Sequence, residues 1–265
     1  MVKKFTEKFY LVFMFVLLYM PIAVLIMSSF NASEKNKAVW GGFTLRAYKA
    51  LIQDEVIMSA LYTTFLLAGG AALIATVLGT LLCIGMMNMG KFFKSTMIGI
   101  AQIPLLNSDI VTGISLMLLF TRFTELSFGT MLVAHVTYII PYVVLSVYPK
   151  IMQLNVSIYE AALDLGASPL FAMRKVIIPD IMPGILTGFM LAFTMSLDDF
   201  SVTYFTKAPG INTMSTMINA EYRKGIQTEI YALSTIIFIV VLIVLFIINR
   251  RSEKAFRFKN ERGVA

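Results

Sequence analysis

The sequence predicts an all-α, polytopic membrane protein with six transmembrane helices. Of its 265 residues, 58% are hydrophobic and only 14% are charged, whereas soluble domains are about 45–50% apolar and about 25% charged. Six segments are also apolar over about 20 residues, which is the length that a helix needs to cross the core of a bilayer. A soluble globular protein is therefore a poor fit, and we treat residues 1–265 as a single transmembrane domain.

The six predicted spans follow one another along the whole chain. Lys3, Lys4 and Lys8 precede the first span as they would a signal peptide, but this span is longer than the usual apolar region of about 7–15 residues and no A-x-A site follows it. We expect it to be retained as a helix. Asp109, in the third span, is the only acidic residue within any of them. The spans cover residues 9–27, about 60–87, about 96–120, 126–149, 181–197 and 230–248.

The positive charges predict the orientation. With the N-terminus inside, 14 of the 22 lysine and arginine residues lie on the inner side and eight on the outer side. Because basic residues near span ends favour the inner side, both termini are expected to be cytoplasmic. The basic tail after Asn249 is interpreted as an anchor against anionic lipid rather than as a nucleic-acid-binding segment.

Several short motifs do not support a catalytic or metal-binding function. Gly85 to Lys91 spells G-x-x-x-x-G-K, but Phe92 replaces the magnesium-binding Ser or Thr of a phosphate loop, and no strand precedes the motif. His135 is the only histidine and Cys83 the only cysteine, so neither a histidine-based metal cluster, a thiolate site nor a serine-protease relay of the ordinary kind is expected. We predict a helix–helix hydrogen bond for His135 and no cofactor bound by this chain.

The inner loop at residues 150–180 is too long for a bare connection and carries its own helix signals. Ser157 and Glu160 are spaced as a capping box, and Gly166 can adopt the left-handed conformation that ends a helix. Ser168 and Pro169 suit the start of a second helix. We therefore predict a helix–turn–helix, referred to below as the inner hairpin.

The two faces of the first hairpin helix are expected to differ. Glu160 and Asp164 are four residues apart and so share one face, whereas an apolar face is formed by Ile158, Ala162 and Leu165. Such a helix is expected to press its apolar face on another surface and to offer the acidic one. Gly184 and Gly188, at the inner end of the fifth span, also form a G-x-x-x-G pattern that permits close helix packing.

The inner hairpin resembles the EAA loop of ABC importer permeases. Glu160, Ala161 and Ala162 are followed by Gly166 and then by Val176-Ile-Ile-Pro179, with Val176 and Ile178 departing from the I-x-L-P end of that pattern. The likeness extends over nearly the whole chain and points to the spermidine/putrescine (PotC-like) family, with its MetI-like fold. It rests on Pro21-Ile22, Ser29-Phe-Asn31, Ser108-Asp-Ile-Val111, Pro141-Tyr-Val-Val144 and Ser196-Leu-Asp-Asp-Phe200.

This resemblance implies a transport subunit of the bacterial inner membrane rather than an enzyme. The hairpin would then be a coupling helix that fits a groove in a cytosolic ATPase, through Glu160, Ala161, Ala162, Asp164, Gly166 and Pro179. The implied partners are a second (PotB-like) permease subunit in a heterodimer, two copies of a cytoplasmic (PotA-like) ATPase that hydrolyses the ATP, and an extracytoplasmic (PotD-like) polyamine-binding protein. Alternating access would pass the polyamine across the membrane.

Carboxylates and aromatic rings suit a polyamine, because its amines are protonated. On a continuous third span, Asp109 is expected roughly 20 Å from the inner end, with Ser108, Thr112 and Ser115 on about the same side. Thr187, Thr194 and Asp198 form a second polar stripe on the fifth span. Asp198 and Asp199 differ by about 100° on a helix, so both line one passage only if the helix breaks there. The candidate substrate path comprises Asp109, Thr194, Asp198, Asp199 and Tyr204.

Other readings of these residues remain open. Asp109 could form a structural hydrogen bond, the Asp198–Asp199 pair could be solvated at a helix end, and Phe200, Tyr204 and Phe205 could form an interfacial aromatic belt. Alternative functions are the same kind of permease for an organophosphonate or ferric ion, a self-contained channel, or a membrane enzyme that uses Asp109 and His135. Carboxylate within the spans favours a cationic solute.

Overall fold

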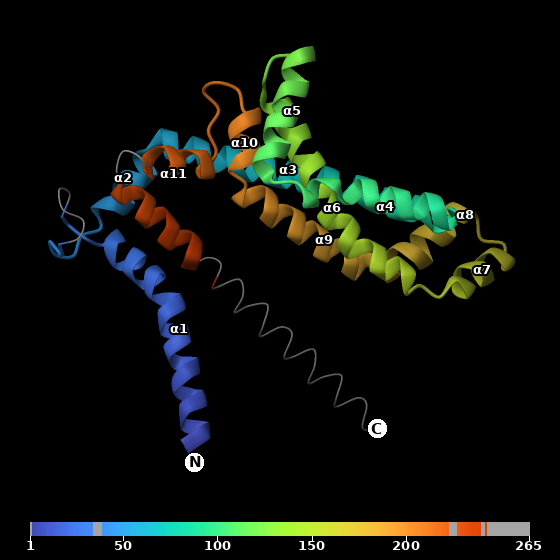
Figure 1. Ribbon diagram of the computed structural model, residues 1–265, viewed down its shortest axis with the longest axis horizontal. Helices are drawn as coiled ribbons and strands as arrows, with labels where there is room; N and C mark the ends of the chain where they lie inside the picture. The colour runs from blue at the N-terminus through green and yellow to red at the C-terminus, as the bar shows by residue number, and fades with distance from the viewer. Residues whose placement is uncertain (1, 34–38, 223–226, 240–241, 243–265) are drawn as a thin grey trace. The chain divides into compact units, whose positions relative to one another are not determined.

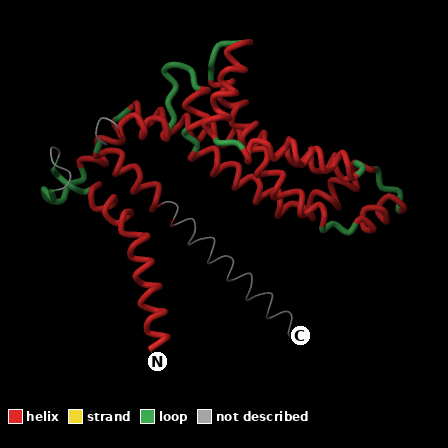
Figure 2. The backbone as a smooth tube through the Cα atoms, in the orientation of Figure 1, coloured by secondary structure: helices red, strands yellow, loops and turns green. Residues whose placement is uncertain are grey.

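The computed structural model describes residues 2–33, 39–222, 227–239 and 242. The chain divides into two compact units, residues 1–58 with 220–265 and residues 59–219. Helices make up almost all of the described residues, and the only β pairing there is an isolated antiparallel bridge between Asn31 and Phe43 (Figures 1 and 2). The all-α prediction is therefore confirmed.

Four of the described helices are long and apolar enough to cross a membrane. They correspond to the first, second, fourth and fifth predicted spans. The fifth begins earlier than predicted, because the second hairpin helix runs without a break into the span. The four helices are α1 (Val2–Ser29, apolar over Lys8–Ser29), α3 (Glu55–Gly85), α6 (Phe128–Met152) and the continuous helix Pro169–Asp198, whose last part is α9 (Ile178–Asp198).

The third predicted span is not one straight helix. It is divided into α4 (Lys91–Leu106) and α5 (Asp109–Phe123), which are bent by 104° at Asn107 and Ser108. Both of these residues have extended backbone angles, and Ser and Asp favour the first positions of a new helix. The expected position of Asp109 along a continuous helix was therefore wrong.

The unit that contains both termini is described only in part. It holds α1, the short amphipathic helix α2 (Arg46–Gln53) and an apolar helix at Thr228–Ile239. In the turn after α1, the Asn31 Oδ1 atom accepts hydrogen bonds from the backbone N–H groups of Ser33 and Gly41. The rest of the predicted sixth span, residues 240–248 except Leu242, and the basic tail lie outside the described residues.

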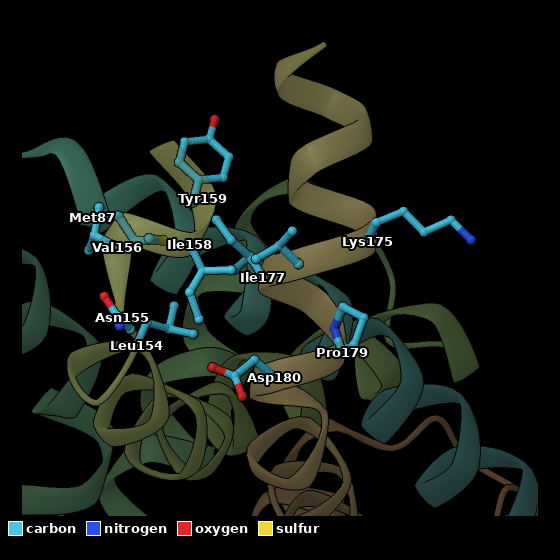
Figure 3. Close-up of a pocket in the computed structure, with 11 residues that line it drawn as sticks. Met87, Leu154, Asn155, Val156, Ile158, Tyr159, Lys175, Ile177, Pro179 and Asp180 are labelled. Carbon is cyan, nitrogen blue, oxygen red and sulfur yellow. The ribbon is translucent and has the colours of Figure 1, made fainter. Parts of the chain in front are cut away.

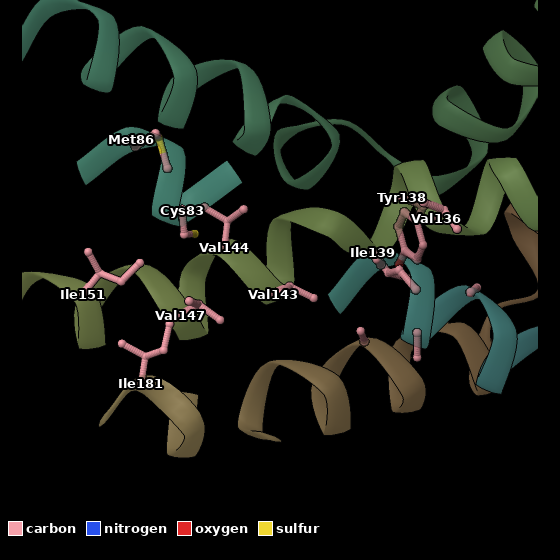
Figure 4. Packing of buried hydrophobic residues seen from close by; sticks show 14 of the residues in the cluster. Cys83, Met86, Val136, Tyr138, Ile139, Val143, Val144, Val147, Ile151 and Ile181 are labelled. Atoms are coloured by element: carbon pink, nitrogen blue, oxygen red, sulfur yellow. The ribbon is translucent and has the colours of Figure 1, made fainter. Parts of the chain in front are cut away.

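In the unit formed by residues 59–219, α6 is the central helix of the core. Figure 4 shows its side chains Val143 and Val147 between those of α3 and α9. A capping box starts α6, because the Ser127 hydroxyl accepts from the Thr130 N–H and the Thr130 hydroxyl accepts from the Ser127 N–H. The remaining helices of this unit are the 3₁₀ turn Met86–Asn88, α10 (Ser201–Thr206), α11 (Met214–Tyr222) and the inner hairpin.

Glycines allow two pairs of helices to approach closely. A Cβ atom added at Gly184 would lie 2.9 Å from the Ser146 carbonyl oxygen, and one at Gly188 would lie 3.2 Å from the Val143 Cα. This confirms that the G-x-x-x-G pattern permits close packing, here between α9 and α6. In the same unit, a Cβ at Gly113 of α5 would lie 3.2 Å from the Val202 Cα of α10.

Candidate functional site

The inner hairpin consists of two short helices between α6 and α9. The first, α7 (Val156–Asp164), is capped by the side chain of Asn155, which accepts from the Ser157 N–H at 3.2 Å. The predicted Ser157–Glu160 capping box was therefore wrong. Asn155 is itself a favoured capping residue, and it stands one position before the helix begins.

The turn between the two hairpin helices follows the prediction. Gly166 has a φ angle of +85°, its N–H donates to the Leu163 carbonyl, and the Ala167 N–H donates to the Ala162 carbonyl. This pair of bonds is the Schellman arrangement that satisfies the last carbonyls of a helix. Ser168 then caps α8 (Pro169–Ala172) through the Phe171 N–H, with Pro169 at the first helical position.

Both faces of α7 are largely open to the surroundings. The acidic side chains of Glu160 and Asp164 are exposed, and so are the apolar ones of Ile158 (56%) and Leu165 (89%). The expected apolar contact is thus not made by the described part of this chain. An exposed apolar surface of this kind is typical of a contact with another molecule.

Behind α7 lies an open recess with a volume of about 430 Å³. Its walls are mostly apolar and come from α7, from the segment that precedes it, from residues 175–177 just before α9 and from the start of α9, with Met87 of the 3₁₀ turn (Figure 3). The Asp180 carboxylate points toward Leu154 and Asn155, whereas the Lys175 side chain extends away from the other labelled residues. Pro179, which belongs to the resemblance pattern, also lines this recess.

A π-helical turn, Met173–Ile177, joins α8 to α9. Pro179 and Pro183 follow it within the first six residues of α9, and neither can donate a backbone hydrogen bond to the preceding turn. The chain nevertheless remains helical from Pro169 to Asp198. The second half of the hairpin and the fifth span are therefore one continuous element.

The candidate substrate-path residues lie at the other end of this unit, near two helix breaks. Asp109 is the first residue of α5 and is exposed. Thr194 and Asp198 are exposed on α9, which ends at Asp198. The Thr187 side chain is exposed on α9 as well, as the predicted stripe requires. The helix thus does break at the Asp198–Asp199 pair.

Asp199, in contrast, is buried, with 7% of its surface exposed. Its carboxylate accepts hydrogen bonds from the backbone N–H groups of Val202 (3.2 Å) and Thr203 (2.8 Å) and from the Thr203 hydroxyl (2.9 Å). These bonds satisfy donors at the start of α10, which would otherwise have no partner within the helix. The geometry gives Asp199 a structural position and leaves Asp198 as the accessible carboxylate of the pair.

His135 forms the helix–helix hydrogen bonds that the sequence predicts. Its Nδ1 atom lies 2.7 Å from the Ser196 Oγ atom of α9, and its Nε2 atom lies 2.9 Å from the Thr203 Oγ1 atom of α10. The Asp199 Oδ2 atom is 3.6 Å from Nε2. The sequence did not indicate that Ser196, His135 and Asp199 meet, but all three are buried, so the group does not form an accessible catalytic site.

Tyr204 belongs to a small aromatic group on α10. Its ring centroid is 5.3 Å from that of Phe200 and 5.3 Å from that of Phe205, and 54% of its surface is exposed.

After α10, the Lys207 ammonium donates to the Asn212 side chain at 2.6 Å, and partial burial lowers the pKa of Lys207. Within the described ranges, no three His, Cys, Asp or Glu side chains are grouped so as to hold a metal ion.

Comparisons with known proteins agree with this architecture. The family described as "Binding-protein-dependent transport system inner membrane component" matches residues 75–258. The putrescine transport system permease protein PotI of Escherichia coli K12 is 38% identical over 253 residues, covering 91% of this chain and 89% of that protein. The spermidine/putrescine permease PotC of the same strain is 33% identical, covering 86% of each.

Solved structures show the same fold at low sequence identity. A bacterial ABC transporter involved in the import of the acidic polysaccharide alginate matches with a TM-score of 0.69 and 17% identity, over 96% of this chain and 98% of that one. The alginate transporter in complex with its pentasaccharide-bound periplasmic protein matches with a TM-score of 0.68 and 16% identity, over 92% of each chain. The present chain belongs to the family of binding-protein-dependent transport system inner membrane components, the permeases of ABC importers.

Proposed function

We propose that this permease carries polyamines, putrescine or spermidine, into the cytoplasm. The observation that carries the proposal is 38% identity, over 91% of the chain, to a protein named as a putrescine permease. The exposed carboxylates of Asp109 and Asp198, with Thr194 and Tyr204, give the outer end of this unit a chemistry that suits protonated amines. Asp199 contributes by holding α10 rather than by contacting the solute.

The energy for transport would come from a cytosolic ATPase that binds the inner hairpin. Glu160 and Asp164 offer acidic groups, and Leu165 and Ile158 offer exposed apolar surface on the same short helix. The left-handed turn at Gly166 fixes the angle between α7 and α8. Because α8 continues into α9, a push on the hairpin would reach the outer end of the membrane-spanning unit through one helix.

The functional assembly would contain more than this chain. We infer a heterodimer with a second permease subunit, two copies of an ATPase and an extracytoplasmic binding protein that delivers the amine. Both termini would lie in the cytoplasm, since that orientation places most of the basic residues inside. The alginate transporter with its periplasmic protein shows that another permease of this fold works with such a partner.

Uptake by the reconstituted complex tests the solute directly. The permease pair, ATPase and binding protein would be placed in liposomes loaded with ATP, and the uptake of labelled putrescine, of labelled spermidine and of a neutral sugar would be compared. We expect ATP-dependent accumulation of one or both amines and none of the sugar. ATP hydrolysis with no amine accumulation would contradict the proposed solute but not the transporter family.

A further inference from the structure

One buried imidazole connects three helices across a break in the chain. His135 extends from α6, and its two ring nitrogens contact Ser196 near the end of α9 and Thr203 in α10. Between these two contacts lies Asp199, whose backbone is extended and which separates the two helices. The surface of His135 is completely buried, and those of Ser196 and Thr203 are almost completely so. The ring thus bridges the break from the side.

The hydrogen-bond directions in this group are determined by their partners. The single hydroxyl proton of Thr203 goes to Asp199, so its Oγ1 atom accepts from His135. This requires the proton of a neutral imidazole to be on Nε2, which leaves Nδ1 to accept from the Ser196 hydroxyl. Every polar atom of the bridge then has a partner, and a change in the angle between α9 and α10 would leave at least one of them buried and unpaired.

The bridge also determines the position of α5. α10 packs against α5 at Gly113, where an added Cβ atom would lie 3.1 Å from the Ser201 carbonyl oxygen and 3.0 Å from the Phe205 ring. Asp109 begins the same helix one turn earlier. The direction of α10 therefore fixes the position of the Asp109 end of α5 relative to Asp198 at the end of α9.

We propose that His135 is a positioning residue that holds α9, α10 and α5 together as one rigid piece. A movement of α9 that starts at the inner hairpin then carries α10 and α5 with it, and the exposed carboxylates of Asp109 and Asp198 keep a fixed separation. The inference that this piece serves transport rests on the proposed function, whereas the rigidity of the piece does not.

A distance measurement tests the rigidity without any assumption about the solute. Spin labels would be placed at the exposed positions Met190 of α9 and Leu118 of α5, as Met190→Cys and Leu118→Cys with Cys83→Ala, in the complete complex in lipid nanodiscs. We expect a narrow distance distribution with His135 and a broader or shifted one with His135→Phe. Because Gln keeps one donor and one acceptor, His135→Gln is expected to restore part of the narrow component.

Transport by the same variants tests the consequence. We expect His135→Phe to lower the amount of solute taken up per ATP hydrolysed by at least about fivefold, the effect of losing a buried hydrogen bond, while the ATP hydrolysis rate stays within about twofold of the parent. The matched control is Thr137→Val, also on α6, because its exposed hydroxyl bonds only to the Val133 carbonyl of its own helix. This control is expected to change neither measurement.

The possible outcomes separate cleanly. An unchanged distance distribution in His135→Phe would overturn the proposal, and so would a changed distribution with an unchanged ratio of uptake to hydrolysis. If His135→Phe does not assemble, Ser196→Ala removes only the bond to Nδ1 and is judged by the same two measurements. A parent complex that takes up no amine would refute the proposed solute, while the distances would still decide the role of His135.

Discussion

Gly184 of α9 faces Ser146 of α6 so closely that an added Cβ atom would lie 2.9 Å from the Ser146 carbonyl oxygen. The same atom would lie 2.8 Å from the Cγ atom of Lys150, in the last turn of α6. The two helices that flank the inner hairpin, α6 and α9, are thus in backbone contact near the ends that connect to it. A force on the hairpin would therefore act on both helices.

Replacing Gly184 by Val is expected to destabilise the protein by about 1–3 kcal/mol, because the added atoms overlap a backbone oxygen that cannot rotate away. Thermal unfolding of the purified complex would measure the effect. Gly69→Val is the matched control, since no atom lies within 4 Å of an added Cβ at Gly69 in α3. Equal melting temperatures for the two variants would contradict the close contact.

Replacing Glu160 by Lys is expected to reduce ATP-dependent uptake by about tenfold or more, because it reverses the charge on the surface proposed to bind the ATPase. Copurification of the ATPase and uptake in liposomes would be measured together. Glu125→Lys makes the same charge change at an exposed position between α5 and α6 and is expected to have little effect. If the ATPase still copurifies with the Glu160→Lys variant and uptake is normal, the hairpin is not its binding surface.

Replacing Gly166 by Val is expected to cost about 1–2 kcal/mol locally, since a side chain strongly disfavours its left-handed backbone conformation. The strain is confined to the hairpin turn, so uptake should fall clearly while the melting temperature of the whole protein changes little. Gly99→Val, in the exposed part of α4 with open space around it, provides the comparison. Normal uptake with Gly166→Val would show that the angle of the turn is unimportant.

The three aspartates are expected to respond differently to replacement by Asn. Asp109→Asn and Asp198→Asn remove exposed charges, so amine uptake should fall without loss of stability. Asp199→Asn converts one of the two accepting oxygens into a donor, which then faces either the Val202 or the Thr203 N–H group, so the melting temperature should fall as well. Uptake and melting temperature of the assembled complexes would separate these cases. A stable, fully active Asp199→Asn protein would disprove its structural position.

Local signals were sufficient to predict the turn of the inner hairpin. Gly166, Ser168 and Pro169 act on their immediate neighbours, and the structure uses all three as predicted. The start of α7 was predicted less well because two capping residues, Asn155 and Ser157, compete there. The chain uses the earlier one, and the backbone N–H of the later one is its donor.

The break in the third span was missed for a different reason. Apolar length was the main criterion, and residues 96–120 satisfy it whether or not the helix is continuous. The local signals for a break were present in Pro104, which removes a backbone donor, and in Asn107, Ser108 and Asp109, which favour a helix start. Together these residues end one helix and start another despite the apolar composition of the segment, because each of them acts directly on the backbone conformation.

The contacts of His135 could not be predicted from the sequence. Its partners, Ser196 and Thr203, are 61 and 68 residues away, and their meeting depends on how α6, α9 and α10 pack. The sequence could indicate only that a lone histidine in a membrane span needs a polar partner. The burial of Asp199 is equally a result of this packing, because its neighbour Asp198 has the same local signals and is exposed.

The π-helical turn at Met173–Ile177 determines how the protein would respond to the loss of one residue there. Such a turn holds one residue more than an α-helical turn, and each residue in an α-helix corresponds to a rotation of about 100°. Deleting one residue there would restore regular winding within the same turn and leave α7 and α8 close to their present direction about the axis of α9, whereas deleting one residue from a regular α-helical turn would rotate them by about 100°. The π-helical turn thus takes up one surplus residue with little change in the direction in which the hairpin leaves the membrane-spanning helix.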